Sequence, residues 1–234
     1  MDRRNFIESC TAGAACISAA AAWPAFAADA KPRAYARAVL VDERGARVKA
    51  SSLQPLANYV FHYPFVATPV FLLDLGQPAP PQALSTQQRD RYAWPGGVGR
   101  NRSLVAFSAI CAHKLVYPTP QVSFISFRKT RAQRGVQDAL IHCCADHSQY
   151  DPARGAQVVS GPAVQPLCAV LLDHDPADDS LTAYATLGGE LFDEFFSKYE
   201  MKLSLDVGPA AHNAVVGQAV VQPLEKFCRN PIQC

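Results

Sequence analysis

The sequence predicts an all-β fold of antiparallel strands with one helix near the C-terminal end. Short runs rich in β-branched and aromatic residues recur along the chain, separated by clusters of Gly, Pro and Asp. Pro is abundant, with 18 residues, which disfavours long helices. A chain of 234 residues that is 49% hydrophobic can bury a substantial core within one domain.

The predicted strands follow one another closely, and only residues 190–199 have apolar side chains at helical spacing. We expect this helix to pack on the core through an aromatic stripe that includes Phe192, Phe195 and Phe196. The Pro- and Gly-rich segment 76–99 is expected to be a long loop. The expected strands are 36–41, 59–63, 70–73, 103–110, 122–127, 139–142, 156–159, 169–172, 181–185 and 215–221.

Charge and cysteine content narrow the function. The net charge is +2, with no basic run, so nothing indicates nucleic-acid binding. The eight Cys residues favour a metal site, disulfides or both. We find no Gly-rich phosphate loop and no pattern typical of a catalytic nucleophile with its base, so no residue is predicted to be catalytic.

Residues 1–30 are typical of an export signal. Arg3-Arg4 begins a twin-arginine pattern, and residues 9–28 are uncharged and rich in Ala. Ala25-Phe26-Ala27 is a small-x-small cleavage site. Cleavage there would release a soluble protein, whereas retention would leave an N-terminal anchor, because about 20 uncharged residues can span a bilayer. Either outcome places the domain formed by residues 31–234 in the periplasm.

Two short motifs supply soft metal ligands. Cys111-Ala112-His113 follows one predicted strand directly, and Cys144-Ala145-Asp146-His147 follows another. If these strands are neighbours, their loops face each other. Two thiolates and two neutral imidazoles then suffice to close a metal site.

These motifs, together with the residues up to Pro162, resemble the Rieske [2Fe–2S] family. The family pattern is Cys-x-His, a later Cys-x-x-His, then Tyr-Asp and a Gly-Pro loop that covers the cluster; here Tyr150-Asp151 and Gly161-Pro162 complete it. The resemblance covers about 104–172 and implies a Rieske-like antiparallel β sandwich with a cluster-binding subdomain. It implies one iron held by Cys111 and Cys144, and the other by His113 and His147.

The resemblance also suggests residues around the cluster. In the family a Ser hydroxyl bonds a cluster sulfide and a Tyr hydroxyl bonds a ligand sulfur, and Ser148 and Tyr150 are the candidates here. Gly161 and Pro162 would belong to the covering loop.

Three departures from the family pattern stand out. The segment between the two motifs is long, and we expect an insertion at about 128–138. Many quinol-oxidising members have an additional Cys in each loop that forms a bracing disulfide, whereas Val116 and Asp146 stand in those places here. The family reads His-Gly-Ser-x-Tyr, and this chain is one residue shorter. An alignment on Ser148-Gln149-Tyr150 would make Cys143 the ligand and put Asp146 in the place of the His. We prefer Cys144, because that alternative removes an imidazole from the second iron.

The remaining cysteines of the domain have simpler roles. Cys228 and Cys234 lie close in sequence and are expected to form a disulfide. Cys143 and Cys168 are expected either to pair or to stay buried as small apolar residues.

The resemblance implies an electron-transfer subunit of a periplasmic oxidoreductase. The leading hypothesis is the iron–sulfur subunit of a quinol–cytochrome c reductase-like complex, with quinol and cytochrome b or c redox partners. The alternative is the small Rieske subunit of a periplasmic molybdenum oxidase such as arsenite oxidase, which would receive electrons from a larger subunit. A structural zinc or disulfide-stabilised domain that only binds a partner is the third hypothesis, because zinc accepts the same ligands.

Overall fold

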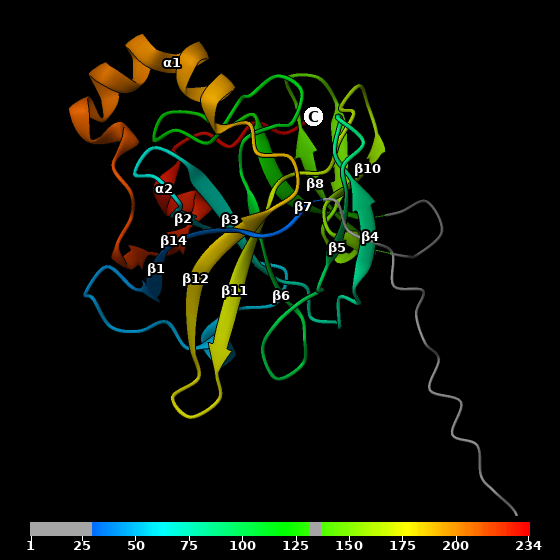
Figure 1. Cartoon of the computed structure of the whole chain (residues 1–234), viewed down its shortest axis with the longest axis vertical. Helices are drawn as coiled ribbons and strands as arrows, with labels where there is room; N and C mark the ends of the chain where they lie inside the picture. The colour runs from blue at the N-terminus through cyan, green and yellow to red at the C-terminus, as the bar shows by residue number, and fades with distance from the viewer. Residues whose placement is uncertain (1–29, 132–136) are drawn as a thin grey trace, which may run out of the picture.

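The computed structural model describes residues 30–131 and 137–234, and within them the chain is organised around β-sheets (Figure 1). The predicted export signal falls on residues 1–29 and so lies outside the described residues. The expectation of an all-β fold with antiparallel strands and a C-terminal helix is confirmed. No helix among the residues described is long and apolar enough to cross a membrane.

The larger sheet has eight strands in the order β13-β1-β12-β11-β6-β3-β2-β14. Neighbouring strands are antiparallel except β1 and β13, which are parallel. The strand bounds are β1 Arg33–Val41, β2 Tyr59–His62, β3 Pro69–Asp74, β6 Leu104–Ser108, β11 Ala169–Asp175, β12 Ser180–Leu187, β13 Gly217–Val220 and β14 Gln222–Pro223.

The central strands β3 and β6 are buried on both faces. Phe71 and Phe107 pack into one hydrophobic cluster, while their neighbours Leu72 and Ala106 pack into a second. Because side chains alternate across a strand, these two clusters lie on opposite faces of the sheet. This explains why both segments are almost continuously apolar in sequence.

A second, four-stranded sheet has the order β10-β9-β8-β7 and is antiparallel throughout. It comprises β7 Ile125–Arg131, β8 Gln137–Cys143, β9 Ser148–Asp151 and β10 Gln157–Ser160. The whole sheet lies between β6 and β11 in the chain, which is where a cluster-binding subdomain was expected. Most of the expected insertion at 128–138 belongs to the paired strands β7 and β8, and residues 132–136 lie outside the described range.

The segment 76–99 is not the expected continuous loop, because it contains the hairpin of β4 (Gln82–Ser85) and β5 (Arg91–Trp94). Its apolar side chains alternate with exposed ones, and Leu84, Tyr92 and Trp94 are buried. In Figure 1 the hairpin lies beside the second sheet. Trp94 comes so close to Gly155 that a side chain there would meet its ring.

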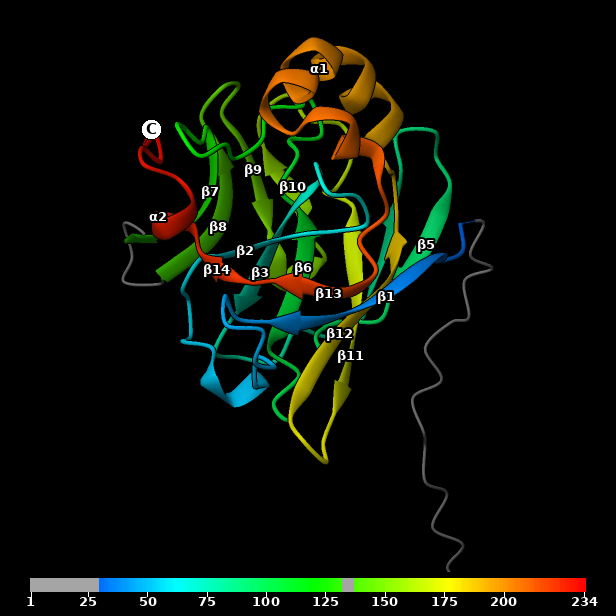
Figure 2. The ribbon, with the colours of Figure 1, turned by 90° about the vertical axis from the view of Figure 1, so that its left-hand side faces the viewer.

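The C-terminal helix α1 runs over Phe192–Asp206, longer than expected, and its buried face includes Phe192, Phe195 and Phe196. These rings pack with Ile110, next to the first motif, so α1 covers that end of the molecule (Figure 2). The remaining helical segments are short: η1 Ala50–Ser52, η2 Pro152–Arg154, η3 Gly208–His212 and α2 Leu224–Phe227.

Candidate metal centre

Two loops form the candidate centre, and each follows a strand as the sequence predicts. Cys111 comes three residues after β6 ends and is fully buried. Its N–H donates to the Val116 carbonyl (2.9 Å), and its carbonyl accepts from Leu115 N–H (3.0 Å), which closes a tight turn. The second loop joins β8 to β9, and Cys143 is the final residue of β8.

Cys111, Cys143 and Asp146 bring their side chains together, with one donor atom of each within 4.8 Å of the others. Both thiols are fully buried, and the Asp146 side chain is only 2% exposed. The group does not include His113, but Nδ1 of His113 lies 2.8 Å from Oδ2 of Asp146. Two sulfurs, one imidazole and one carboxylate therefore converge from the two loops.

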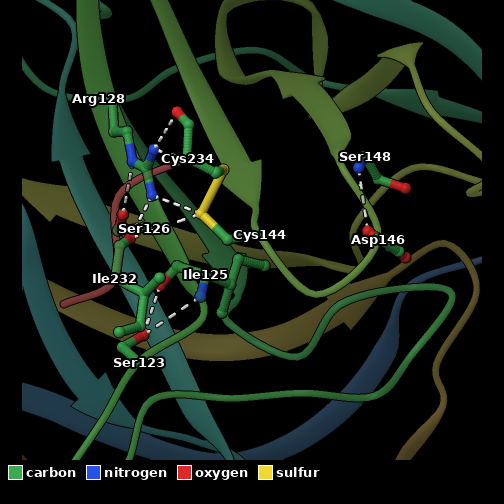
Figure 3. The surroundings of a disulfide bond; sticks show 9 residues. All are labelled: Ser123, Ile125, Ser126, Arg128, Cys144, Asp146, Ser148, Ile232 and Cys234. Carbon is green, nitrogen blue, oxygen red and sulfur yellow. Dashed lines mark hydrogen bonds between the residues drawn. A yellow bond between two sulfur atoms is a disulfide. The ribbon is translucent and has the colours of Figure 1, made fainter.

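Cys144 does not join this group, which differs from its expected role as a ligand. Its Sγ is bonded to Sγ of Cys234, ninety positions along the chain (Figure 3). Successive side chains on a strand point to opposite faces, so Cys143 at the end of β8 faces Cys111 and the next side chain turns away from it. Arg128 lies beside the disulfide, and its guanidinium donates to Cys144 Sγ (2.7 Å) and to the Cys234 carbonyl (3.2 Å).

The expected disulfide between Cys228 and Cys234 is not formed. Cys228 follows α2 and is buried in the hydrophobic core as a free thiol. The chain after it runs beside Ser123, whose carbonyl accepts from Ile232 N–H (2.8 Å), and this path carries Cys234 to Cys144. Cys168 is also free and buried, and does not pair with Cys143.

His147 is exposed and is not part of the group of mutually close donors. It lines a cavity of about 260 Å³ whose wall also includes Cys143, His142 and Cys234. Its backbone has φ +61°, a left-handed conformation that favours Gly. His147 directly precedes Ser148, and in the family pattern the residue directly before this Ser is Gly. The backbone therefore favours the alignment on Ser148-Gln149-Tyr150, in which Cys143 and Asp146 take the ligand positions.

Tyr150 and Ser148 support the two loops from β9. The fully buried Tyr150 hydroxyl lies 3.5 Å from Cys111 Sγ and accepts from Ala112 N–H (3.2 Å). This agrees with the expected contact between a Tyr hydroxyl and a ligand sulfur. The buried Ser148 hydroxyl instead accepts from Ala163 N–H (3.1 Å) and thereby fastens the Gly-Pro loop.

Gly161 allows the Gly-Pro loop to lie directly on the second metal-binding loop. A Cβ at this position would come within 2.4 Å of Ser148 Cα and 2.7 Å of the His147 carbonyl oxygen, and φ is +91°. Both conditions require Gly. Pro162, next in the loop, is exposed.

The thiols are arranged to share a negative charge. The hydrogen bond from Cys143, together with one from Tyr150, lowers the pKa of Cys111 to about 7 despite burial. The same pairing with Cys111, added to burial, raises the pKa of Cys143. Burial of Asp146 opposes its ionisation, but the N–H of Ser148 and neighbouring donors outweigh this effect and lower its pKa. Two adjacent sulfurs with low exposure and a stabilised carboxylate fit a bound metal ion or cluster.

A scan against protein-family models finds no match. Among solved structures, the chain is similar to the soluble domain of Rieske protein II (soxF) from Sulfolobus acidocaldarius. The two are 26% identical, the match covers 67% of this chain and 82% of that one, and the TM-score is 0.45. The chain resembles the Rieske family. This resemblance rests on the order of the motifs and on the way the two Cys loops and Tyr150 meet.

Sequence reasoning on the Rieske-like motifs placed Cys111, His113 and Tyr150 in one centre, as the structure has them. It set Cys143 and Asp146 aside in favour of Cys144 and His147. The signal that points to Cys143 and Asp146 was present in the sequence, namely their spacing to Ser148-Gln149-Tyr150.

Proposed function

We propose that this protein is a one-electron carrier that holds a Rieske-type [2Fe–2S] cluster. The observation that supports this most is the meeting of two buried thiols, Cys111 and Cys143, with the His113 imidazole beyond them at the protein edge. A bound cluster would supply a redox couple that changes by one electron. Cys111 and Cys143 would hold one iron, and His113 would hold the other.

The protein's own groups set the conditions for electron transfer. The hydroxyl of Tyr150 reaches Cys111 Sγ and stabilises additional negative charge there, which favours the reduced state. His113 is 37% exposed, whereas both thiols are fully buried. A redox partner that contacts the surface would therefore meet the imidazole of His113 first.

We place this carrier in the periplasm, as a subunit of an oxidoreductase complex. The twin-arginine pattern Arg3-Arg4 supports export. The disulfide between Cys144 and Cys234 fits an oxidising compartment. The partner is either a quinol–cytochrome c reductase-like assembly or a larger molybdenum oxidase subunit of the arsenite oxidase kind.

The experiment is to express the full chain with export and to analyse the purified protein for iron, acid-labile sulfide and zinc. We expect two irons and two sulfides per chain, visible absorption, and an EPR signal after reduction. Cys111→Ser should abolish the signal. Cys168→Ser is the matched control, because Cys168 is also a buried free thiol but lies outside the centre. A colourless protein with one zinc would identify a structural zinc domain instead.

The two partner hypotheses predict different redox behaviour. A redox titration followed by EPR gives a potential that falls with rising pH if a ligand imidazole takes up a proton with the electron, as quinol oxidation requires. A reduction potential that does not change with pH favours the relay from a larger subunit. Mass spectrometry of the mature N-terminus shows whether residues 1–30 are retained as an anchor.

A further inference from the structure

We propose that Asp146 is the fourth protein ligand of the cluster, so that one iron is held by an imidazole and a carboxylate. This inference rests on the proposed function and concerns the donor set alone. It replaces the two-Cys, two-His set of the family pattern with two Cys, one His and one Asp.

The position of Asp146 is the first argument. Its Oδ2 lies 2.8 Å from Nδ1 of His113 and 3.5 Å from Sγ of Cys111. Its side chain is 2% exposed, and Cys143 completes the group of mutually close donors. A carboxylate this deeply buried needs a cation or a metal to offset the loss of its hydration. Its Oδ2 contacts Nδ1 of His113, which is itself a metal-binding side chain.

The second argument is the orientation of the carboxylate. Ser148 N–H donates to Oδ1 of Asp146 (2.9 Å), in a turn that fixes the side chain (Figure 3). Oδ1 is therefore occupied by the backbone, and Oδ2 is the oxygen that faces His113 and Cys111. A ligand held by a hydrogen bond on its other atom is a common feature of metal sites.

The third argument is that neither Cys144 nor His147, the ligands expected from the sequence, belongs to the donor group. The sulfur of Cys144 belongs to the disulfide with Cys234 and contacts Arg128, on the other side of the loop (Figure 3). His147 is exposed and lies outside the group of mutually close donors, although it lines the same cavity as Cys143. Among the described residues of this loop, Asp146 is the group that extends the donor set beyond Cys143.

The chemical consequence is a matter of charge. An imidazole ligand is neutral, whereas a carboxylate adds one negative charge to the iron that it binds. Replacing one of two imidazoles by a carboxylate therefore favours the oxidised cluster, and the reduction potential is lower than with two His ligands. Asp146→His would reverse this effect.

The test counts nitrogen ligands by pulsed EPR on the reduced protein, which detects coupling to each coordinated ¹⁴N. We expect one coordinated imidazole nitrogen in the wild type, lost in His113→Ala wherever a cluster remains. We expect two in Asp146→His, together with a higher potential. His147→Ala is the matched control and should leave both the nitrogen count and the potential unchanged. Asp146→Asn keeps the shape of the side chain and should change the g-values or lose iron, with the circular dichroism spectrum unchanged.

Two results would overturn the inference in distinguishable ways. A wild-type cluster with two coordinated nitrogens, one of which disappears in His147→Ala, shows that His147 is the ligand and leaves the proposed function intact. A wild-type protein without acid-labile sulfide removes the proposed function itself, and the donor set with it.

Discussion

The imidazole of His113 and the carboxylate of Asp146 are in contact, with Nδ1 2.8 Å from Oδ2, although each belongs to a different loop. Strands β6 and β8 end at the same side of the molecule and bring the two loops together. The contact joins an exposed side chain to a buried one, because His113 is 37% exposed and Asp146 only 2%. It therefore links the interior of the centre to its surface.

Substitution of Cys143 and of its neighbour Cys144 should have different effects on the EPR signal and on stability. Cys143→Ser is expected to abolish the EPR signal, because it removes a buried sulfur from the donor group. Cys144→Ser is expected to keep the signal and to lower the free energy of unfolding by about 2–5 kcal/mol through loss of the disulfide. EPR and thermal unfolding of both variants check this.

Cys234→Ser is the control for the disulfide, since it breaks the same bond from the other end. It should reproduce the loss of stability seen in Cys144→Ser. Loss of the signal in Cys144→Ser but not in Cys143→Ser would restore the ligand assignment drawn from the sequence.

The Tyr150 hydroxyl should tune the reduction potential. Tyr150→Phe removes its contact with Cys111 Sγ and is expected to lower the potential by roughly 20–60 mV, the equivalent of one net hydrogen bond. Tyr63→Phe is a matched control, because the Tyr63 hydroxyl is buried and has no hydrogen-bond partner in the described structure. Equal potentials in wild type and Tyr150→Phe would remove this role, and redox titration decides.

The close packing of the Gly-Pro loop predicts a large effect of Gly161→Ala. The new Cβ would collide with Ser148 Cα, and the residue would also keep a strained positive φ. Gly45→Ala carries a comparable φ of +78° but meets no atom within 4 Å, so it isolates the cost of the collision. We expect Gly161→Ala to be less stable than Gly45→Ala by on the order of 1–3 kcal/mol. Equal denaturant midpoints for the two variants would contradict the close approach.

Stability should fall in mild acid because of His62. Burial lowers its pKa from 6.5 to about 4, and its ring packs edge-on against Phe227. Below pH 6.5 the unfolded chain binds a proton at this residue while the folded protein does not, so stability declines as pH falls toward 4. Because His62 as a whole residue is only half-buried, we expect a loss on the order of 1–2 kcal/mol.

The measurement is the unfolding free energy of wild type and His62→Gln between pH 7 and pH 4. The pKa of His142 is also lowered, by burial and by Arg128, so His142 contributes to the pH dependence of both proteins. The difference between the two profiles therefore gives the contribution of His62 alone. Parallel profiles would show that His62 does not contribute to the pH dependence.

Most core strands could be predicted because their β-branched and apolar runs match the burial that two-sided packing requires. The β4–β5 hairpin was missed because Leu84 and Tyr92 alternate with small or polar residues among Pro-rich flanks, a weak strand signal. The pairing of Cys234 could not be predicted, because it depends on the path of the chain past Ser123. The ligand register was ambiguous in sequence, and the backbone conformation of His147 favours the alternative that had been set aside.

The neighbouring sulfurs of Cys143 and Cys144 have a consequence for how the protein matures. In a reducing cytoplasm Cys144 and Cys234 remain thiols, so no covalent bond fastens the C-terminal segment to the loop between β8 and β9. Cys143 still faces Cys111, because the alternation of side chains along β8 does not depend on the disulfide. We therefore expect protein harvested before oxidation to differ from the oxidised protein in stability and not in its donor set.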